Sequence, residues 1–179
     1  VFHPGASDET EPGSLLFVGN SEDYNKGVVY LLRAMAQLPA SSRAHLYVVG
    51  GPSGALRVAP AEIERLGITD RVTIVGRVPE RELAAWYRRA QLLVSPSLYE
   101  GFGLPVAEAM ASGTAVVASD GGALPELVGG GATGRVVPAR EGLYGTGRRD
   151  RLSPRSERGG LRMPLEAPSL RVAGLTACT

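Results

Sequence analysis

Short apolar runs alternate with amphipathic segments from residue 14 to residue 137. The runs are nearly unbroken and rich in Val and Leu, which is typical of strands buried on both faces. The segments between them place apolar residues at helical spacing, as Val28, Leu31 and Leu32 do. Strands are predicted at 14–19, 44–49, 71–75, 91–94, 115–118 and 135–137, and helices at 25–38, 61–66, 80–89, 105–112 and 124–128. This alternation predicts an α/β fold, a Rossmann-like parallel sheet with helices on both faces.

Glycine and small polar residues follow most of the predicted strands. They stand at 19–20, 50–51, 76–77, 97–103 and 119–122. Ligands of such sheets bind beyond the carboxyl ends of the strands, so these five loops predict a binding cleft along one edge. Any single glycine among them is explained equally well by a tight turn.

The stretch from Ser95 to Met110 combines a strand end, a turn and a helix start. Glycines around Phe102 allow a close approach of the backbone to a ligand, and the first N–H groups of a helix favour an anion. Pro105 is expected at the first helical position. Glu100 and Glu108 stand eight residues apart and could accept hydrogen bonds from hydroxyl groups. Amides for an anion beside carboxylates for hydroxyls fit a nucleotide sugar. The alternative is a tight turn whose glutamates are solvated.

The sequence EGFGLPVAEAMASGTAVVASDGGALPELV, which begins at Glu100, resembles the donor-binding signature of retaining GT-B glycosyltransferases of the family 4, or group 1, type. Glu100 and Glu108 form its E-x7-E pattern, which is specific only within these surroundings. The resemblance extends over about residues 1–141. It implies the C-terminal, donor-binding half of a GT-B fold, and transfer of a hexosyl group from a nucleotide diphosphate sugar with retention of configuration.

The resemblance also implies two catalytic residues, Lys26 and Glu100. Lys26 is the only lysine beside 18 arginines and stands where the family binds the diphosphate. Its compact charge suits phosphate, although a surface lysine is the alternative. Asn20 departs from the family, which usually has Arg there. A neutral amide in place of one phosphate contact lowers transition-state stabilisation by about 2–4 kcal/mol.

The remaining donor contacts follow from the same resemblance. Glu108 is expected to bind the ribose hydroxyls and Glu100 those of the transferred sugar. Arg77 contacts the nucleotide base or is a solvated loop residue. Independently of the resemblance, the aromatic rings of Trp86 and Tyr87 would either stack on a ligand or, as their helical spacing favours, belong to the core. The full expected donor-binding set is Gly19, Asn20, Lys26, Gly76, Arg77, Glu100, Gly101, Phe102, Gly103, Leu104 and Glu108.

Charge and composition bound the partners. The net charge is +1, which does not indicate a nucleic-acid partner. The single cysteine, Cys178, fits a reducing compartment, and no apolar run is long enough to cross a bilayer, so a cytoplasmic location is expected. No Asp-x-Asp motif or His/Cys cluster is present, and the family works without a metal, so neither a metal nor another cofactor is expected.

The predicted domain spans 14–141, after an interdomain linker at 1–13. Periodicity stops near Glu141, and residues 142–179 are predicted to be a disordered tail, for which an altered reading frame or a truncation is one hypothesis. The family's N-terminal domain, which holds most of the acceptor site and can contact a membrane surface, is absent from the sequence. The chain alone is therefore expected to turn over poorly, and the acceptor is unknown.

Two other functions stay open. A non-catalytic nucleotide-sugar-binding module, or an inactive truncated fragment, is favoured by Asn20 and by the tail. A dinucleotide-binding oxidoreductase domain would share the fold. The first predicted strand-to-helix turn, GNSEDYNKG, argues against it because it lacks the G-x-G-x-x-G pattern.

Overall fold

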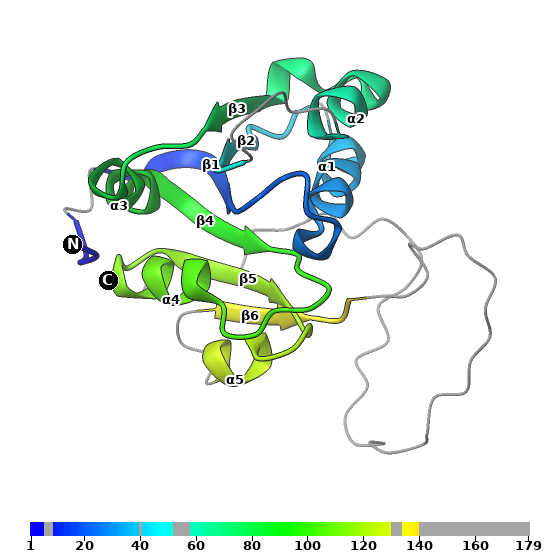
Figure 1. Ribbon diagram of the computed structural model, residues 1–179. Helices are drawn as coiled ribbons and strands as arrows, with labels where there is room; N and C mark the ends of the chain where they lie inside the picture. Colours follow the sequence, from blue (N-terminus) through cyan, green and yellow to red (C-terminus); the bar gives the residue numbers. More distant parts are fainter. Residues whose placement is uncertain (6–8, 40, 52–57, 130–133, 140–179) are drawn as a thin grey trace, which may run out of the picture.

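A six-stranded sheet, parallel throughout, forms the centre of the computed structural model (Figure 1). The structure describes residues 1–5, 9–39, 41–51, 58–129 and 134–139; the expected tail at 142–179 lies outside them. The strand order is β3-β2-β1-β4-β5-β6, the order of a Rossmann fold. This confirms the predicted fold class. The strands are β1 (Glu11–Val18), β2 (His45–Val49), β3 (Val72–Gly76), β4 (Ala90–Ser95), β5 (Ala115–Ser119) and β6 (Gly134–Val137).

Helices cover both faces of the sheet. Figure 1 shows α1 and α2 on one side and α3, α4 and α5 on the other. The α-helices are α1 (Val28–Gln37), α2 (Val58–Leu66), α3 (Glu80–Arg89), α4 (Leu104–Ala111) and α5 (Leu124–Val128). Two short 3-10 turns, η2 (Tyr24–Lys26) and η3 (Thr69–Arg71), complete the described elements. None of the helices in these ranges is long and apolar enough to span a membrane.

Each sheet face has its own hydrophobic core, because successive side chains of a strand point to opposite faces. Leu16 packs with α3, α4 and α5, whereas its neighbour Phe17 packs with α1 and α2. Val49 and Val48 divide in the same way on β2. All four side chains are at most 2% exposed, and burial of each stabilises the fold by about 1.5–3 kcal/mol. The two-sided burial explains why the strands are almost uninterrupted apolar runs.

Most predicted elements differ from the observed ones by one residue at an end, and four other differences change an element or the place of a residue in it. β1 begins at Glu11, so residues 11–13 belong to the sheet and not to the linker. Glu11 pairs with Ala90, although Pro12 and Gly13 separate it from the regular part of the strand. α2 begins at Val58, three positions before the predicted start. The predicted helix at 25–38 is divided into η2 and α1 at Gly27, whose φ is +69°. Pro105 is the second residue of α4, where its missing N–H still removes no helical hydrogen bond.

The strand order reverses beside β1. β1 pairs with β2 on one side and with β4 on the other, so the connections leaving β1 and β4 go to opposite faces. In open α/β sheets this switch point is where ligands bind, beyond the carboxyl ends of the strands. The loops that follow β1 and β4 contain Lys26 and Glu100.

Candidate functional site

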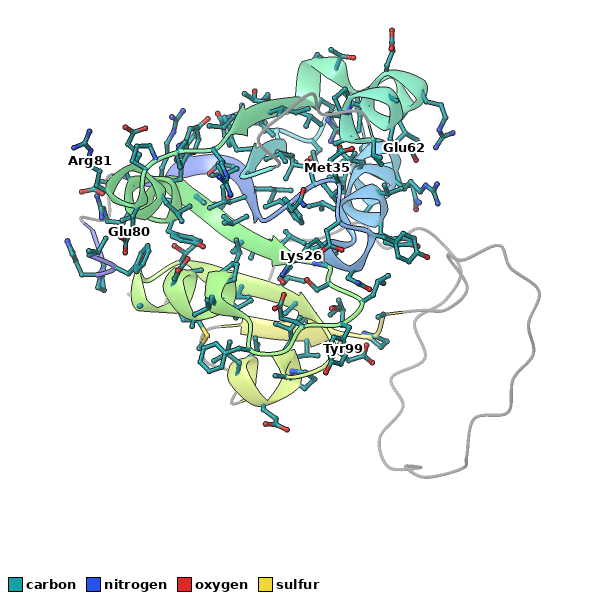
Figure 2. The ribbon with its side chains drawn as sticks, viewed as in Figure 1. Lys26, Met35, Glu62, Glu80, Arg81 and Tyr99 are labelled. Carbon is teal, nitrogen blue, oxygen red and sulfur yellow. The ribbon has the colours of Figure 1, made fainter. Side chains whose placement is uncertain are left out.

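Lys26 and Glu100 form an ion pair at this switch point. The Nζ of Lys26 donates to Oε2 of Glu100 at 2.6 Å, although the two residues are 74 positions apart. The side chains are 26% and 14% exposed, so the pair is only partly screened by water. Figure 2 shows Lys26 at the carboxyl end of β4, between the upper and lower halves of the sheet. The structure thus joins the two residues expected to be catalytic.

The β1–α1 loop holds Lys26 by a short 3-10 turn. Asp23 accepts a hydrogen bond from the N–H of Asn25 at 2.9 Å and so caps this turn. Gly27 then adopts a left-handed conformation with φ +69°, and a Cβ there would lie 2.1 Å from the carbonyl oxygen of Pro96. The N–H of Leu98 donates to the oxygen of Asn25 at 2.8 Å. Two loops from distant parts of the sequence are therefore fixed against each other.

The β4–α4 loop is fixed from its other side by the β5–α5 loop. Gly121 approaches the carbonyl oxygen of Ser97, to which buried Ser119 also donates through Oγ. The N–H of Ala123 donates to the carbonyl oxygen of Glu100 at 2.9 Å. Because backbone contacts hold this loop on both sides, the position of the Glu100 backbone depends on the fold and not on its own side chain.

Helix α4 begins beside Glu100. Gly103 precedes it with φ +85°, and a Cβ there would meet side-chain atoms of Leu124 and Leu127. The side chains of Phe102 and Leu104 are 63% and 60% exposed, so they lie outside the core. The backbone N–H groups of 102–104 stand at the helix N-terminus, where they favour a negative ligand. Figure 2 shows Tyr99 on the same loop, and it too is exposed.

Glu108 lies on α4, one helical turn beyond its start, and contacts a residue of α3. The hydroxyl of Tyr87 donates to its Oε2 at 2.8 Å. Burial, followed by this hydrogen bond and the charge of Glu108, raises the pKa of Tyr87 far above its ordinary value. Tyr87 is fully buried, as the helical spacing predicted, and its link to Glu108 could not be deduced from the sequence.

Asn20 is the exposed residue directly after Gly19 at the end of β1. Its Oδ1 accepts a hydrogen bond from the N–H of Glu22 at 3.0 Å. This contact turns the carbonyl side of the amide toward its own loop, which leaves the N–H2 side as the donor for a ligand. The side chain carries no charge, so it offers hydrogen bonds but no counter-charge for a phosphate.

Gly76 and Arg77 also lie at the carboxyl ends of the strands, but farther from Lys26 than Asn20 does. Gly76 ends β3, which is the outermost strand beside β2 in the described sheet, and β2 separates it from β1. At the usual strand spacing, the end of β3 is about 10 Å from the end of β1. Backbone hydrogen bonds connect these ends: Gly19 donates to Val49 at 3.0 Å and Gly50 to Gly76 at 2.8 Å. Gly76 and Arg77 are thus placed for a distant part of a ligand and not for the atoms near Lys26.

Metal binding has no geometric support among the described residues. Within those ranges, no group of three or more His, Cys, Asp or Glu side chains could hold an ion. His45 is the first residue of β2, at the amino ends of the strands, and its Nε2 contacts Thr73 at 2.8 Å. Trp86 packs against Tyr47 at 5.0 Å between ring centroids, away from the Lys26–Glu100 pair.

Comparison with known proteins gives one family. The family model described as "Glycosyl transferases group 1" matches residues 12–144. Over 124 residues the chain is 44% identical to the lipopolysaccharide core biosynthesis mannosyltransferase LpcC of Rhizobium leguminosarum bv. viciae, a match that covers 66% of this chain and 35% of that protein. The chain spans about a third of the length of the curated relatives it matches.

Solved structures resemble this one in the same segment. Sucrose-phosphate synthase from Thermosynechococcus elongatus matches with a TM-score of 0.68 and 33% identity, over 79% of this chain and 38% of that one. Anabaena HepE in complex with UDP-glucose matches with a TM-score of 0.63 and 26% identity, over 70% of this chain and 35% of that one.

Proposed function

The chain belongs to the glycosyl transferases group 1 family, as its E-x7-E segment indicated, and we propose that it binds the nucleotide-sugar donor of a retaining hexosyltransferase. The matching relatives are glycosyltransferases of the GT-B type, and the matching segment is their C-terminal part. The observation that carries the proposal is the Lys26–Glu100 ion pair at the switch point of the sheet, beside the N-terminus of α4.

Lys26 and the amides of α4 would bind the diphosphate. Cleavage of the bond between the sugar and the diphosphate leaves negative charge on the departing phosphate. A lysine ammonium and the first N–H groups of a helix stabilise that charge where it develops. We expect no metal to be needed, because these groups supply the counter-charge. Arrival of a diphosphate would give Lys26 a second negative partner beside Glu100.

Glu100 and Glu108 would bind hydroxyl groups. Glu100 uses Oε2 for Lys26, so a sugar hydroxyl can donate to its other oxygen. Glu108 lies farther along α4 and would accept from the ribose. The base would extend toward Gly76 and Arg77, at the end of β3. The donor would thus lie along the carboxyl edge, with its transferred sugar near β4 and its base near β3.

Retention of configuration is part of the proposal. An acceptor hydroxyl attacks the anomeric carbon from the face that the diphosphate leaves. The new carbon–oxygen bond forms as the bond to the phosphate oxygen breaks, and the acceptor proton passes to that phosphate oxygen. In this reaction the protein positions the reactants and stabilises charge, and no side chain acts as the base.

The relatives support a hexose as the transferred sugar, but they do not show which hexose this chain would use. LpcC is named a mannosyltransferase, whereas HepE was crystallised with UDP-glucose. The acceptor site is proposed to lie mainly in a second domain, which could also supply a membrane contact. Asn20, in place of the expected arginine, favours slow turnover more than weak donor binding. A non-catalytic nucleotide-sugar-binding module therefore remains the second candidate.

Calorimetric titration of the chain without added metal tests donor binding. GDP-mannose, UDP-glucose and NAD are the titrants. We expect one nucleotide sugar to bind, and Lys26→Ala and Glu108→Ala each to weaken its binding by at least about tenfold. Arg33→Ala is the matched control, because Arg33 is also ion-paired but lies on α1, away from the switch point. NAD binding alone, or equal losses in all three variants, would contradict the proposal.

Single-turnover assays separate the enzyme from the binding module. The chain is mixed with the N-terminal half of a group 1 glycosyltransferase and the donor that binds. Transfer with retained configuration supports the donor half of an enzyme. Donor binding without transfer or donor hydrolysis supports the non-catalytic alternative.

A further inference from the structure

Tyr87 has a polar atom in an otherwise apolar environment. The residue is 0% exposed, and it belongs to the core shared by α3, α4 and α5. Its hydroxyl donates to Oε2 of Glu108 at 2.8 Å, from the last turn of α3 to the second turn of α4. A buried hydroxyl needs a partner, and this one is a carboxylate that is itself only partly buried. The contact therefore connects the core to the surface of α4.

The position of the Tyr87 ring is fixed by several contacts. The ring of Phe2 packs edge-on against it, with 5.8 Å between centroids. Thr114 donates through Oγ1 to the carbonyl oxygen of Tyr87 at 2.6 Å. Since the side chain has no exposed surface, its hydroxyl cannot move to another partner without disturbing the core. The raised pKa keeps that hydroxyl protonated, so it remains a donor across the working pH range.

A carboxylate on a helix surface samples several rotamers unless a contact selects one. Tyr87 selects the orientation in which Oε2 of Glu108 points to α3. The second oxygen is then held in one direction and can accept from a ligand hydroxyl. Preorganised acceptors bind hydroxyls more tightly because less conformational freedom is lost on binding.

We propose that Tyr87 is a positioning residue that orients Glu108 for the ribose hydroxyls of the nucleotide. The inference rests on the proposed function, in which Glu108 binds the ribose. It predicts a specificity: the buried tyrosine contributes to discrimination between ribonucleotides and deoxyribonucleotides without touching either. Ribose recognition by this chain then depends on the packing of α3 against α4.

The test is titration of the 179-residue chain with UDP, GDP and ADP, followed by the 2′-deoxy and 3′-deoxy counterparts of the one that binds best. We expect the wild type to prefer the ribonucleotide by about tenfold. Tyr87→Phe should reduce this preference to about threefold or less, mainly by weakening ribonucleotide binding. Glu108→Gln should reduce it as well, and the double variant should show little further loss, because the two residues act through one contact.

Two more variants separate loss of the Tyr87–Glu108 contact from general damage to the fold. Phe2→Leu removes the edge-on ring contact but keeps the Tyr87 hydroxyl, so the preference should remain about tenfold. Glu108→Asp draws the carboxylate back from Tyr87 at a partly exposed site, which should lower the preference even where Tyr87→Phe does not fold.

The outcomes distinguish a failure of the proposed donor binding from a failure of the proposed role of Tyr87. If the wild type binds none of the nucleotides, the proposed function and the inference both fail. If it binds ribonucleotides and deoxyribonucleotides equally, donor binding stands and the inference fails. If Tyr87→Phe or Glu108→Asp folds and keeps the full preference, the hydroxyl has only a structural role and the inference alone is overturned.

Discussion

Two glutamates of this chain are almost equally buried and bind cations at similar distances, yet they stand in different regions. Glu62 lies on α2 and accepts from Arg33 at 2.8 Å and from Arg65 at 2.7 Å. Glu100 lies on the β4–α4 loop and accepts from Lys26 at 2.6 Å. Their side chains are 12% and 14% exposed. Distance and burial therefore do not distinguish the ion pair between two helices from the ion pair that is proposed to bind a ligand.

The two glutamates differ in how many of their carboxylate oxygens already accept hydrogen bonds, and in where they lie in the fold. Both oxygens of Glu62 accept hydrogen bonds from arginine, which holds α2 against α1 and leaves little capacity for a ligand. Glu100 uses Oε2 for Lys26 and, at 3.4 Å, for Ser97. It also lies at the switch point of the sheet, where ligands bind. Within the described part of the chain, Oε1 of Glu100 accepts no hydrogen bond, so this carboxylate beside a cation is suited to a ligand that has hydroxyls and phosphates.

The largest expected effect comes from two glycines with the same backbone conformation. Gly27, in the loop region, has φ +69°, and a Cβ there would lie 2.1 Å from the oxygen of Pro96. Gly67, at the end of α2, has φ +65° and no neighbour within 4 Å of such a Cβ. Gly67→Ala should lower the free energy of unfolding by about 1 kcal/mol, from backbone strain alone. Gly27→Ala adds a backbone clash and should lower it by about 3 kcal/mol.

Urea denaturation of both variants and the wild type measures this difference. Gly27→Ala should also weaken nucleotide-sugar binding, because its clash separates the loops that position Lys26 and Glu100. Equal losses of stability in the two variants would show that the loops tolerate separation and are not fixed by this contact.

The next prediction concerns the two carboxylates themselves. Glu62→Gln removes the charge from a carboxylate that accepts from two arginines, and should lower the free energy of unfolding at pH 7 by about 1 kcal/mol, because both arginines are partly exposed and screened. Glu100→Gln removes one cation contact and should cost less than about half of that. For nucleotide-sugar binding the order should reverse, with only Glu100→Gln causing a loss. Denaturation and calorimetry on the same samples check both orders.

The pH dependence of stability sharpens the same comparison. Hydrogen bonds from Arg65, joined by one from Arg33, lower the pKa of Glu62 to about 2 from an ordinary value of 4.5. A lowered pKa in the folded chain means that the carboxylate stabilises the fold above pH 4.5, and that this contribution is lost as the pH falls toward 2. The stability difference between the wild type and Glu62→Gln should therefore be constant above about pH 5.5 and shrink toward zero near pH 2. A difference that persists at pH 2 would mean that Gln disturbs packing and not charge.

Most of the fold could be predicted because strand burial leaves a strong pattern. Leu16 and Phe17 are adjacent and pack into the cores on opposite faces of the sheet, which is the two-sided burial that a short unbroken apolar run predicts. Glu11 lacks that signal: it follows acidic and polar residues and precedes Pro12 and Gly13, yet it pairs with Ala90. Boundaries in polar segments depend on partners that are distant in the sequence, and periodicity does not show those partners.

The sequence singled out candidate site residues but did not show the contacts that they make. Lys26, Glu100 and Glu108 stand out by motif, and the structure brings the first two together at the switch point. Tyr87 looked like one more apolar residue of an amphipathic helix, because its hydroxyl finds Glu108 only when α3 packs on α4. Such a contact depends on the three-dimensional arrangement of two helices that are separated by a strand and a loop.

The smallest expected effect concerns Phe102, and it shows whether the donor contacts the backbone N–H or the aromatic ring of this residue. Its side chain is 63% exposed, so Phe102→Ser should change the free energy of unfolding by no more than about 0.5 kcal/mol. The substitution keeps the backbone N–H that stands before α4. If this amide is what faces the donor, nucleotide-sugar affinity should change by less than about twofold, far less than in Lys26→Ala. A tenfold loss with unchanged stability would show instead that the aromatic ring stacks on the ligand, and the exposed surface beside α4 would then belong to the site.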